Sequence, residues 1–348
     1  MPADPDLHSF RQTDPGTLFL VSTAVVLRIP GVMIRIYFCV RAEWFMMIVS
    51  ASRRTDIPAC FPAWFCRRIA AGFCFVRNPY SGLLTEVSLL PEDVDVIVFW
   101  TKDAGPLCSR LSAVDACGIP YYFQYTVTPY GRDLEPGFAK ERSISAFLEL
   151  SDRLGPERVL WRYDPVLISD RYSPAFHAEA FSRLCELFAG RTERCTMSFA
   201  DRYPGLPVRE CTTAEMEEFA EFASAAAKDA GISLYTCAEE IDLRRFGILP
   251  GSCVDAALCE RLAGYPLRTV RDAGQRDGCC CVESVDIGAY GSCRNGCLYC
   301  YAGGAHPSPV FHDPDSPLLL GTVRPDESAV VRRSGSLRDT QTRLFPDC

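Results

Sequence analysis

The chain has 348 residues, 48% hydrophobic and 23% charged, which is the composition of a soluble globular protein with one large domain or two ordinary ones. Its formal net charge of -8 argues against a general nucleic-acid-binding surface, because such proteins usually carry a basic footprint. Its 19 cysteines would suggest disulfides in an exported protein, but metal binding or catalysis in a reducing cytosol.

The apolar segment 18–40 is the one candidate for export or membrane insertion. Arg28 and Arg35 interrupt it, and each central arginine costs roughly 2.5–3.5 kcal/mol on insertion scales. Acidic residues precede it, where a signal peptide needs positive charge. We therefore expect a cytoplasmic protein without a membrane signal. Residues 1–46 are predicted to be an N-terminal extension outside the fold, with the native start near Met47.

From Met47 onward, short apolar runs alternate with amphipathic stretches, a pattern typical of repeated βα units and a parallel sheet. Eight runs qualify as strands, the last less clearly than the others. They are residues 47–51, 73–78, 95–101, 121–128, 159–166, 195–201, 232–238 and 282–290.

Helices fit between most of these strands. Residues 56–72 carry Trp64 and Phe65 on one apolar face and end at a glycine. Residues 212–231 open with Thr212 and Glu215 at the spacing of a capping box. We expect the apolar faces of both helices to be core.

The number and spacing of these elements predict an α/β fold, a (β/α)8-type barrel or close variant over residues 47–290. An open doubly wound sheet is the alternative. Residues 291–348 would then form a cysteine-cluster loop and a C-terminal arm, because the composition beyond residue 302 becomes rich in proline, glycine and aspartate.

Polar residues follow nearly every predicted strand. In barrels and doubly wound sheets, the carboxyl ends of parallel strands converge on one cavity, so these residues are candidates for catalysis. Charges also flank strands simply because loops face water, and for any single residue that explanation is about as good. Two arginines and a lysine on one rim would suit an anionic substrate or a cofactor carboxylate. The candidates are Arg53, Arg54, Asp56, Lys102, Gln124, Arg162, Asp164, Glu239 and Glu240.

Cys293, Cys297 and Cys300 form a compact C-x3-C-x2-C trio directly after the last predicted strand. Structural zinc sites usually close with four ligands that arrive as two pairs. Three cysteines alone would leave one iron of an iron–sulfur cluster without a protein ligand. An iron–sulfur cluster is therefore favoured over zinc or free thiols.

The trio, with Tyr299 before its third cysteine, resembles the radical-SAM signature. That resemblance implies a [4Fe-4S] cluster whose fourth iron binds S-adenosylmethionine, an external electron donor, and Tyr299 packed beside the cofactor. Two features differ from ordinary members of that superfamily. The trio follows the last strand instead of the first, and no "GGE" motif follows the second strand.

The wider chain resembles the prokaryotic DUF1848 family, a domain of unknown function with a C-terminal cysteine cluster similar to the radical-SAM one. The similarity runs from about Met47 to the end. It is carried by segments such as "SASRRTDIPA", "FWTKDAGPL", "WRYDPV", "YTCAEEIDL" and "GQRDGCCCVESVDIGAYGSCRNGCLYCYA".

Thirteen of the remaining cysteines fall into two groups. Nine are scattered singly and are interpreted as small buried hydrophobes: Cys60, Cys66, Cys74, Cys108, Cys117, Cys185, Cys195, Cys211 and Cys259. Cys237, Cys253, Cys279 and Cys281 lie in the family-like segments. They suit a second iron–sulfur cluster or zinc, and alternatively Cys279 or Cys281 supplies a fourth ligand to the trio.

Three functions follow from these patterns. The first is a radical-SAM-like enzyme acting on an unidentified small-molecule or macromolecular substrate. The second is a zinc-stabilised binding or scaffold protein without catalysis. The third is a barrel hydrolase or lyase that uses Asp164, Glu239 and Glu240 for acid–base chemistry.

Overall fold

The computed structural model describes residues 21–29, 32–40, 47–201, 208–303 and 311–331. The chain divides into two compact units, residues 1–44 and 45–348. In the first unit, β1 (Val21–Ile29) pairs antiparallel with β2 (Val32–Val40). That residues 1–46 lie outside the fold stays a prediction. Among the described residues, no helix has both the length and the apolar character to cross a membrane.

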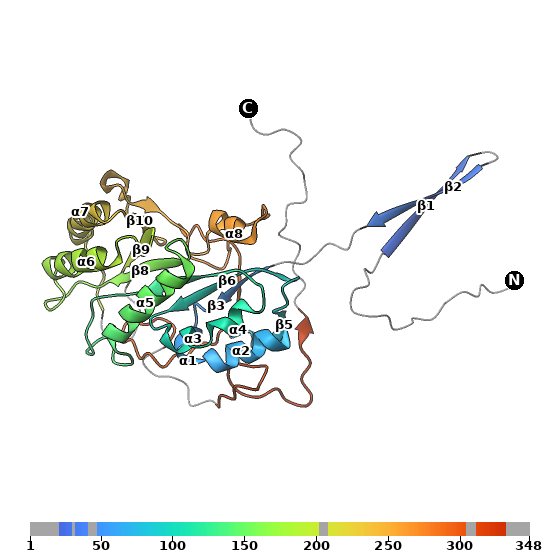
Figure 1. Ribbon diagram of the computed structural model, residues 1–348, viewed down its shortest axis with the longest axis horizontal. Coiled ribbons are helices and arrows are strands. Elements are labelled where there is room, and N and C mark those ends of the chain that lie inside the picture. Colours follow the sequence, from blue (N-terminus) through green and yellow to red (C-terminus); the bar gives the residue numbers. More distant parts are fainter. Residues whose placement is uncertain (1–20, 30–31, 41–46, 202–207, 304–310, 332–348) are drawn as a thin grey trace. The chain divides into compact units, whose positions relative to one another are not determined.

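Among the described residues, eight strands of the second unit form one parallel sheet, in the order β11-β10-β9-β8-β7-β6-β3-β12 (Figure 1). The α/β class is therefore confirmed. The strands are β3 (Met47–Ala51), β6 (Val94–Thr101), β7 (Tyr121–Thr126), β8 (Val159–Val166), β9 (Arg194–Phe199), β10 (Ser233–Thr236), β11 (Leu249–Pro250) and β12 (Val285–Asp286).

A closed barrel is not confirmed, because the sheet ends at β11 and β12 instead of joining its edges. From β3 to β11 the strands follow chain order, as in a barrel, and lack the reversal of a doubly wound sheet. Side chains from residues 253–282 pack against Ile48, Val96 and Leu160 on one face of the sheet, called the inner face below.

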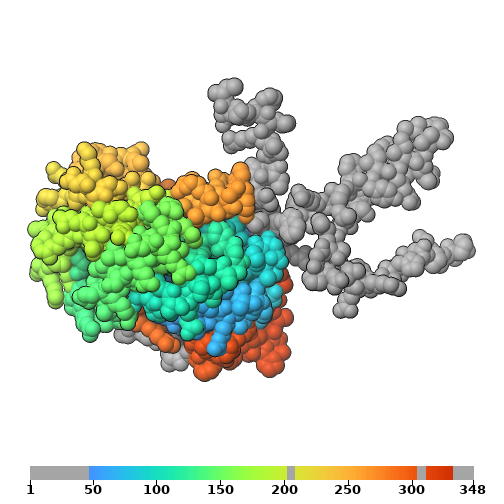
Figure 2. All heavy atoms as spheres, in the orientation of Figure 1, coloured from blue at the N-terminus to red at the C-terminus, as the bar shows by residue number. Residues whose placement is uncertain are grey.

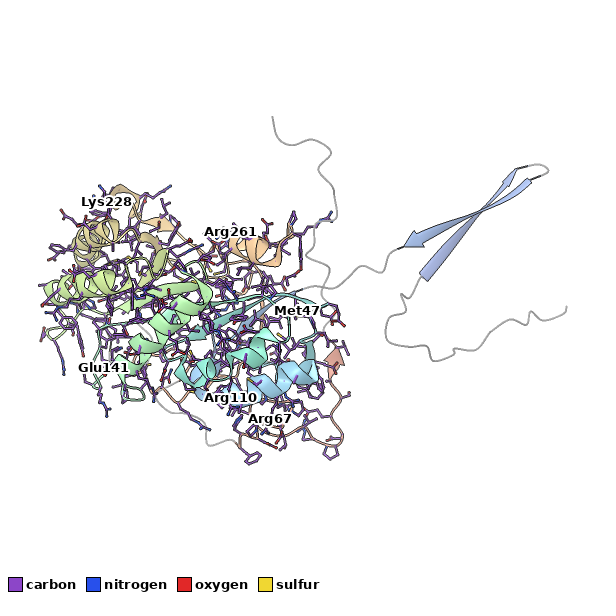
Figure 3. The ribbon with its side chains drawn as sticks, in the orientation of Figure 1. Met47, Arg67, Arg110, Glu141, Lys228 and Arg261 are labelled. Carbon is purple, nitrogen blue, oxygen red and sulfur yellow. The ribbon has the colours of Figure 1, made fainter. Side chains whose placement is uncertain are left out.

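The outer face of the sheet carries the larger hydrophobic core, which contains Trp64, Phe99, Trp161 and Phe219. Helices that contribute to it cover this face (Figure 1). They are α1 (Ile57–Cys60), α2 (Pro62–Ala71), α3 (Gly105–Cys108), α4 (Leu111–Asp115), α5 (Lys140–Leu154), α6 (Pro174–Phe188) and α7 (Thr213–Asp229). Their charged side chains, such as Arg67 and Lys228, extend outward (Figure 3).

The two helix predictions hold with one adjustment. α7 begins with the expected capping box between Thr212 and Glu215. The predicted helix 56–72 divides into α1 and α2 around Phe61, and α2 ends at Gly72, whose positive φ of 77° suits a residue without a side chain. The predicted core residues Trp64 and Phe65 are fully buried. α8 (Ala256–Ala263) packs on the inner face instead, after the 3-10 turn η1 (Arg244–Phe246).

One predicted strand belongs to a different sheet. β4 (Phe73–Arg77) pairs antiparallel with β5 (Leu84–Ser88), and β13 (Val330–Val331) pairs with β5. The six residues between β4 and β5 allow a hairpin but are too few for a parallel crossover. The C-terminal segment 311–331 lies beside α2 (Figure 2), where the indole of Trp64 donates to the Ser316 carbonyl at 3.0 Å.

Candidate functional site

The cysteine trio lies on a loop fixed to the first part of the sheet. Cys293 and Cys297 are buried and Cys300 is half-buried. The side-chain amide of Asn295 donates to the Asp56 carboxylate at 2.8 Å. The backbone carbonyl of Asn295 accepts from the Gly137 amide at 3.0 Å. A Cβ on Gly137 would lie 2.2 Å from that carbonyl oxygen, so only glycine permits this approach. The loop is therefore seated closely between α1 and residues 134–137.

Asp56 joins three parts of the chain. It follows β3, caps α1 by accepting from the Ala59 amide at 2.9 Å, accepts from the Lys102 amide at 2.7 Å, and holds Asn295 in the cysteine loop. Burial raises the pKa of Asp56 to about 6, although these donors oppose the shift. These hydrogen bonds all join Asp56 to other residues of the chain, so we interpret Asp56 as a structural residue that connects the ends of β3 and β6 to the cysteine loop.

The pH dependence of stability should report this tie. The pKa of Asp56 is higher in the folded chain than its usual 3.8, so the folded state holds its proton more tightly. The unfolding free energy should therefore fall as pH rises from about 4 to about 6, by ~3 kcal/mol from this group. Urea unfolding across this range should show that slope in the wild type and its loss in Asp56→Asn. An identical slope in both proteins would contradict the assignment.

Glu135 is a buried carboxylate next to the trio that was not among the predicted site residues. It is 2% exposed and accepts hydrogen bonds from Lys102 at 2.8 Å, from the Thr128 hydroxyl at 2.6 Å, and from Lys140 and the Tyr299 hydroxyl. Burial favours its neutral form, but the two lysines outweigh burial and lower its pKa to about 2. Glu135 thereby links the end of β6 to the third cysteine's aromatic neighbour.

Lys102 faces the cysteine trio. Its ammonium lies 5.4 Å from the centre of the Tyr299 ring, and its charge favours the thiolate of Cys297. Burial nevertheless dominates at Cys297 and raises the pKa of that thiol to about 12. For Lys102 itself, burial lowers the pKa, but the negative charges of Glu135, Cys297 and Asp164 and the hydrogen bond to Glu135 together outweigh burial and raise the pKa.

Cys60, which was interpreted from the sequence as a small buried hydrophobe, also lies beside the trio. Its thiol is hydrogen-bonded with Cys293, and its sulfur accepts from the Arg294 amide at 3.4 Å. This contact and burial raise the pKa of Cys293 above its ordinary range. Cys279 and Cys281, the two cysteines considered as a fourth ligand, contact each other, and Cys281 also contacts Cys253. Cys60, the last residue of α1, is therefore in contact with the trio through Cys293.

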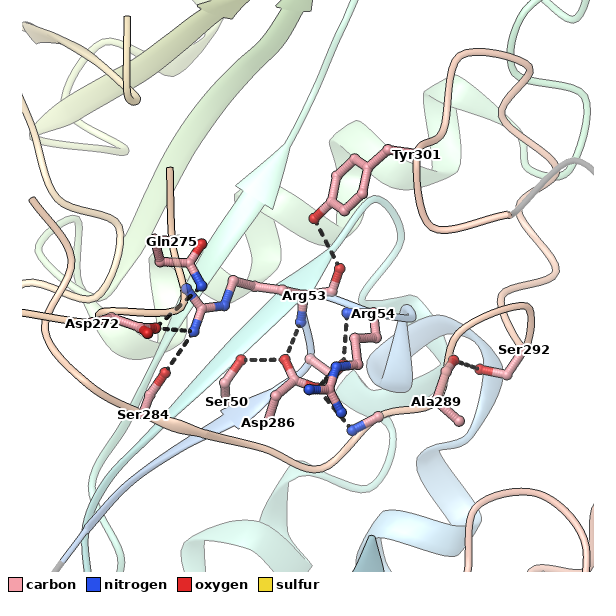
Figure 4. Close-up of polar contacts among 12 residues, drawn as sticks. Ser50, Arg53, Arg54, Asp272, Gln275, Ser284, Asp286, Ala289, Ser292 and Tyr301 are labelled. Atoms are coloured by element: carbon pink, nitrogen blue, oxygen red, sulfur yellow. Dashed lines mark hydrogen bonds and ion pairs between the residues drawn. The ribbon is translucent and has the colours of Figure 1, made fainter. Parts of the chain in front are cut away.

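A cavity of about 480 Å3 is lined in part by Tyr290 and Tyr301, which flank the trio in sequence. Arg53, Arg54 and Tyr301 line it, and the Tyr301 hydroxyl donates to the Arg53 carbonyl at 3.2 Å (Figure 4). The guanidinium of Arg53 donates to Asp272 at 3.0 Å and to Ser284 at 2.9 Å, while its second terminal nitrogen is buried and has no hydrogen-bond partner among the described residues.

Asp286 in β12 fixes this wall of the cavity to β3. Its carboxylate accepts from the hydroxyls of Ser50 at 2.9 Å and Ser52 at 2.7 Å, and from the Arg53 amide at 2.7 Å (Figure 4). The Arg54 guanidinium lies 4.0 Å from it. These bonds position the two predicted arginines at the cavity, and Asp286 was not among the predicted residues.

The other predicted residues spread along the carboxyl edge of the sheet. Arg162 forms an ion pair with Asp164 and also donates to the sulfur of Cys253. Gln124 donates to the Cys253 carbonyl at 2.7 Å. Glu239 accepts from the Phe199 amide at 2.9 Å, and burial raises its pKa to about 7, whereas Glu240 is exposed. Among the nine strand-end candidates, Arg53 and Arg54 line the cavity described above.

The thiols of the trio are close enough for Cys293 and Cys300 to affect the ionisation of Cys297. Three thiols on one loop are the donor type that an iron–sulfur cluster requires. In their present orientations, no three or more histidine, cysteine, aspartate or glutamate side chains of the described residues are arranged to hold a metal ion. The trio therefore has the donor atoms that a cluster requires, but its thiols are not arranged in the geometry of a metal site.

Comparison with known proteins gives one match. The profile of a family described as "Domain of unknown function (DUF1848)" matches residues 48–302, which span the parallel sheet, the strand-end residues and the cysteine trio. No curated protein and no solved structure matches the chain.

Proposed function

We propose that this protein, which belongs to the DUF1848 family, is an iron–sulfur enzyme of radical-SAM type. The observation that carries the proposal is the seating of three cysteines on one loop, which is bonded to Asp56 and Glu135 and is followed by Tyr301 in the wall of a polar cavity. Cys293, Cys297 and Cys300 would hold a [4Fe-4S] cluster. When bound and reduced, that cluster supplies the electron that cleaves the sulfonium of S-adenosylmethionine.

The chain's own residues have separate tasks in this proposal. Asp56 and Glu135 hold the cysteine loop from two sides through Asn295 and Tyr299. Lys102 places a positive charge near Cys297, which favours the thiolate that binds iron. The Tyr299 ring and its buried neighbours exclude water from this side of the loop.

Arg53 and Arg54 would bind the anionic part of a substrate or cofactor in the adjoining cavity. A guanidinium presents a planar fork of donors that matches a carboxylate or phosphate. One terminal nitrogen of Arg53 is buried, and no described residue accepts a hydrogen bond from it. Tyr301 follows Cys300 directly and lines the cavity, so a ligand bound there would lie near the trio.

Acid–base chemistry has less support, because most of the strand-end carboxylates are already engaged. Asp164 is paired with Arg162, and Asp56 ties the cysteine loop. A mechanism based on two carboxylates needs two groups whose environments separate their pKa values. Glu239 has a raised pKa of about 7, but its neighbour Glu240 is exposed to solvent.

The proposal is tested by anaerobic reconstitution with iron and sulfide, followed by S-adenosylmethionine and dithionite. We expect a brown protein with about four irons per chain and release of 5′-deoxyadenosine detected by mass spectrometry. A colourless protein that binds only zinc would contradict the proposal. A brown protein that leaves S-adenosylmethionine intact under strong reduction would also contradict it.

Cys60→Ser tests whether the cluster keeps an open iron. If three cysteines bind the cluster, this variant should keep wild-type iron and wild-type release of 5′-deoxyadenosine. If Cys60 closes the cluster as a fourth ligand, the wild type should be inactive and the variant should gain cleavage, which would overturn the three-ligand assignment.

A further inference from the structure

Four cysteines that the cluster proposal does not use gather on the inner face of the sheet. Cys237 follows β10, Cys253 follows β11, and Cys279 and Cys281 belong to the loop before β12. The sulfurs of Cys237 and Cys253 are 3.6 Å apart. Cys281 is hydrogen-bonded with both Cys253 and Cys279. Segments separated by up to 44 positions thus bring four thiols into one chain of contacts.

The surroundings of these sulfurs suit negative charge. The backbone amides of Cys253 and Val254 both donate to the sulfur of Cys281, at 3.2 and 3.4 Å. Arg162, whose side chain is only 7% exposed, donates to the sulfur of Cys253. Amide donors and a buried cation are what a site with several thiolates needs, because burying unpaired charge is costly.

We propose that Cys237, Cys253, Cys279 and Cys281 form a mononuclear tetrathiolate site for Zn²⁺. Four sulfurs about 2.3 Å from one zinc ion lie about 3.8 Å apart at the edges of a tetrahedron. The observed 3.6 Å between Cys237 and Cys253 is close to this edge. In a [4Fe-4S] cluster each thiolate binds a different iron, so its sulfurs lie farther apart.

The thiols contact one another in the order Cys237, Cys253, Cys281, Cys279 and do not form a closed tetrahedron. Accordingly, no group of three or more potential ligands among the described residues has the geometry of a metal site. Closing the tetrahedron requires Cys279, which contacts Cys281, to approach Cys237 and Cys253 as well.

The site would fix one wall of the cavity. The loop between α8 and β12 carries Asp272 and Ser284, which hold the guanidinium of Arg53 (Figure 4). Cys279 and Cys281 lie in the same loop and would attach it to the ends of β10 and β11. Zinc would thus have a structural role that does not depend on a cluster at the trio.

The experiment measures zinc, iron and sulfide separately in the purified full chain after growth with zinc and iron. We expect about one zinc per chain in the wild type. Cys253→Ser and Cys281→Ser should each lose at least about fivefold in zinc while keeping iron. Cys280→Ser is the matched control, because Cys280 lies between two proposed ligands but is exposed. It should keep wild-type zinc.

Cobalt substitution gives a readout on the wild-type chain, independent of how the variants fold. Co²⁺ should produce the strong visible absorption of a tetrahedral tetrathiolate site, and added zinc should remove it. Wild-type chain without zinc and without this cobalt spectrum would overturn the proposal. Unchanged zinc in Cys281→Ser, or iron and sulfide lost together from Cys253→Ser and Cys281→Ser, would also overturn it.

Discussion

If the proposed cluster binds at the trio, alanine at any one of Cys293, Cys297 and Cys300 should remove most of the bound iron and abolish reductive cleavage of S-adenosylmethionine. Loss of a group that only supports a metal ligand typically costs 10–100-fold in affinity or activity, and loss of a ligand should cost more than that, roughly 100-fold or beyond. The large core on the outer face of the sheet does not include the trio, so the variants should still fold. Iron content, 5′-deoxyadenosine release and circular dichroism measure the three effects.

Cys117→Ser is the control for these variants. Cys117 follows α4, away from the trio in sequence, and its thiol donates to the Val114 carbonyl at 2.8 Å, a bond that a serine hydroxyl can also make. This variant should keep wild-type iron and cleavage. Retention of iron and cleavage in all three trio variants would show that these cysteines do not hold the cluster.

Glu135→Gln is expected to destabilise the fold by about 3–5 kcal/mol, the usual cost of removing one partner from a buried ion pair. The amide would leave Lys102 and Lys140 without their shared negative charge, and Glu135 itself is almost fully buried. Chemical denaturation at pH 7 measures the loss. Glu141→Gln is the control, because Glu141 lies close by at the exposed start of α5 and should change stability little.

The effect of Glu135 should also depend on pH. Its pKa is lowered from 4.5 to about 2 in the folded chain, so its stabilising contribution is complete above about 4.5 and is lost as pH falls through about 2. The difference in unfolding free energy between wild type and Glu135→Gln should therefore shrink over this range. A difference that stays constant down to pH 2 would show that the charge of Glu135 is not responsible.

The sequence predicted most of the parallel sheet because buried strands of this kind are continuous apolar runs, as in residues 95–101 and 159–166. Residues 73–78 were predicted to join the parallel sheet but belong to the other sheet, because an apolar run indicates a strand without indicating which sheet the strand joins. The short connection from Asn78 to Leu83 was the available signal for a hairpin. β11 has only two residues and is defined by its pairing with β10, so no local sequence pattern predicts it.

The site was predictable where its residues directly follow strands. Arg162 and Asp164 alternate along β8, and this period placed both on the same side of the sheet. Glu135, Cys60 and Asn295 were missed because their roles arise from contacts between distant segments. A lone cysteine on a helix has no local feature that distinguishes a core residue from a neighbour of the trio.

The pairing of β12 with β3 has a consequence for how the protein is made. Asp286 bonds to Ser50 across 236 positions, so the ribosome has synthesised most of the chain before the first strand of the sheet acquires its outer neighbour. Until then, one edge of β3 has unpaired backbone groups, and such an edge can pair with another chain. A nascent or truncated chain ending before residue 285 should therefore depend on chaperones until β12 is available to cover this edge.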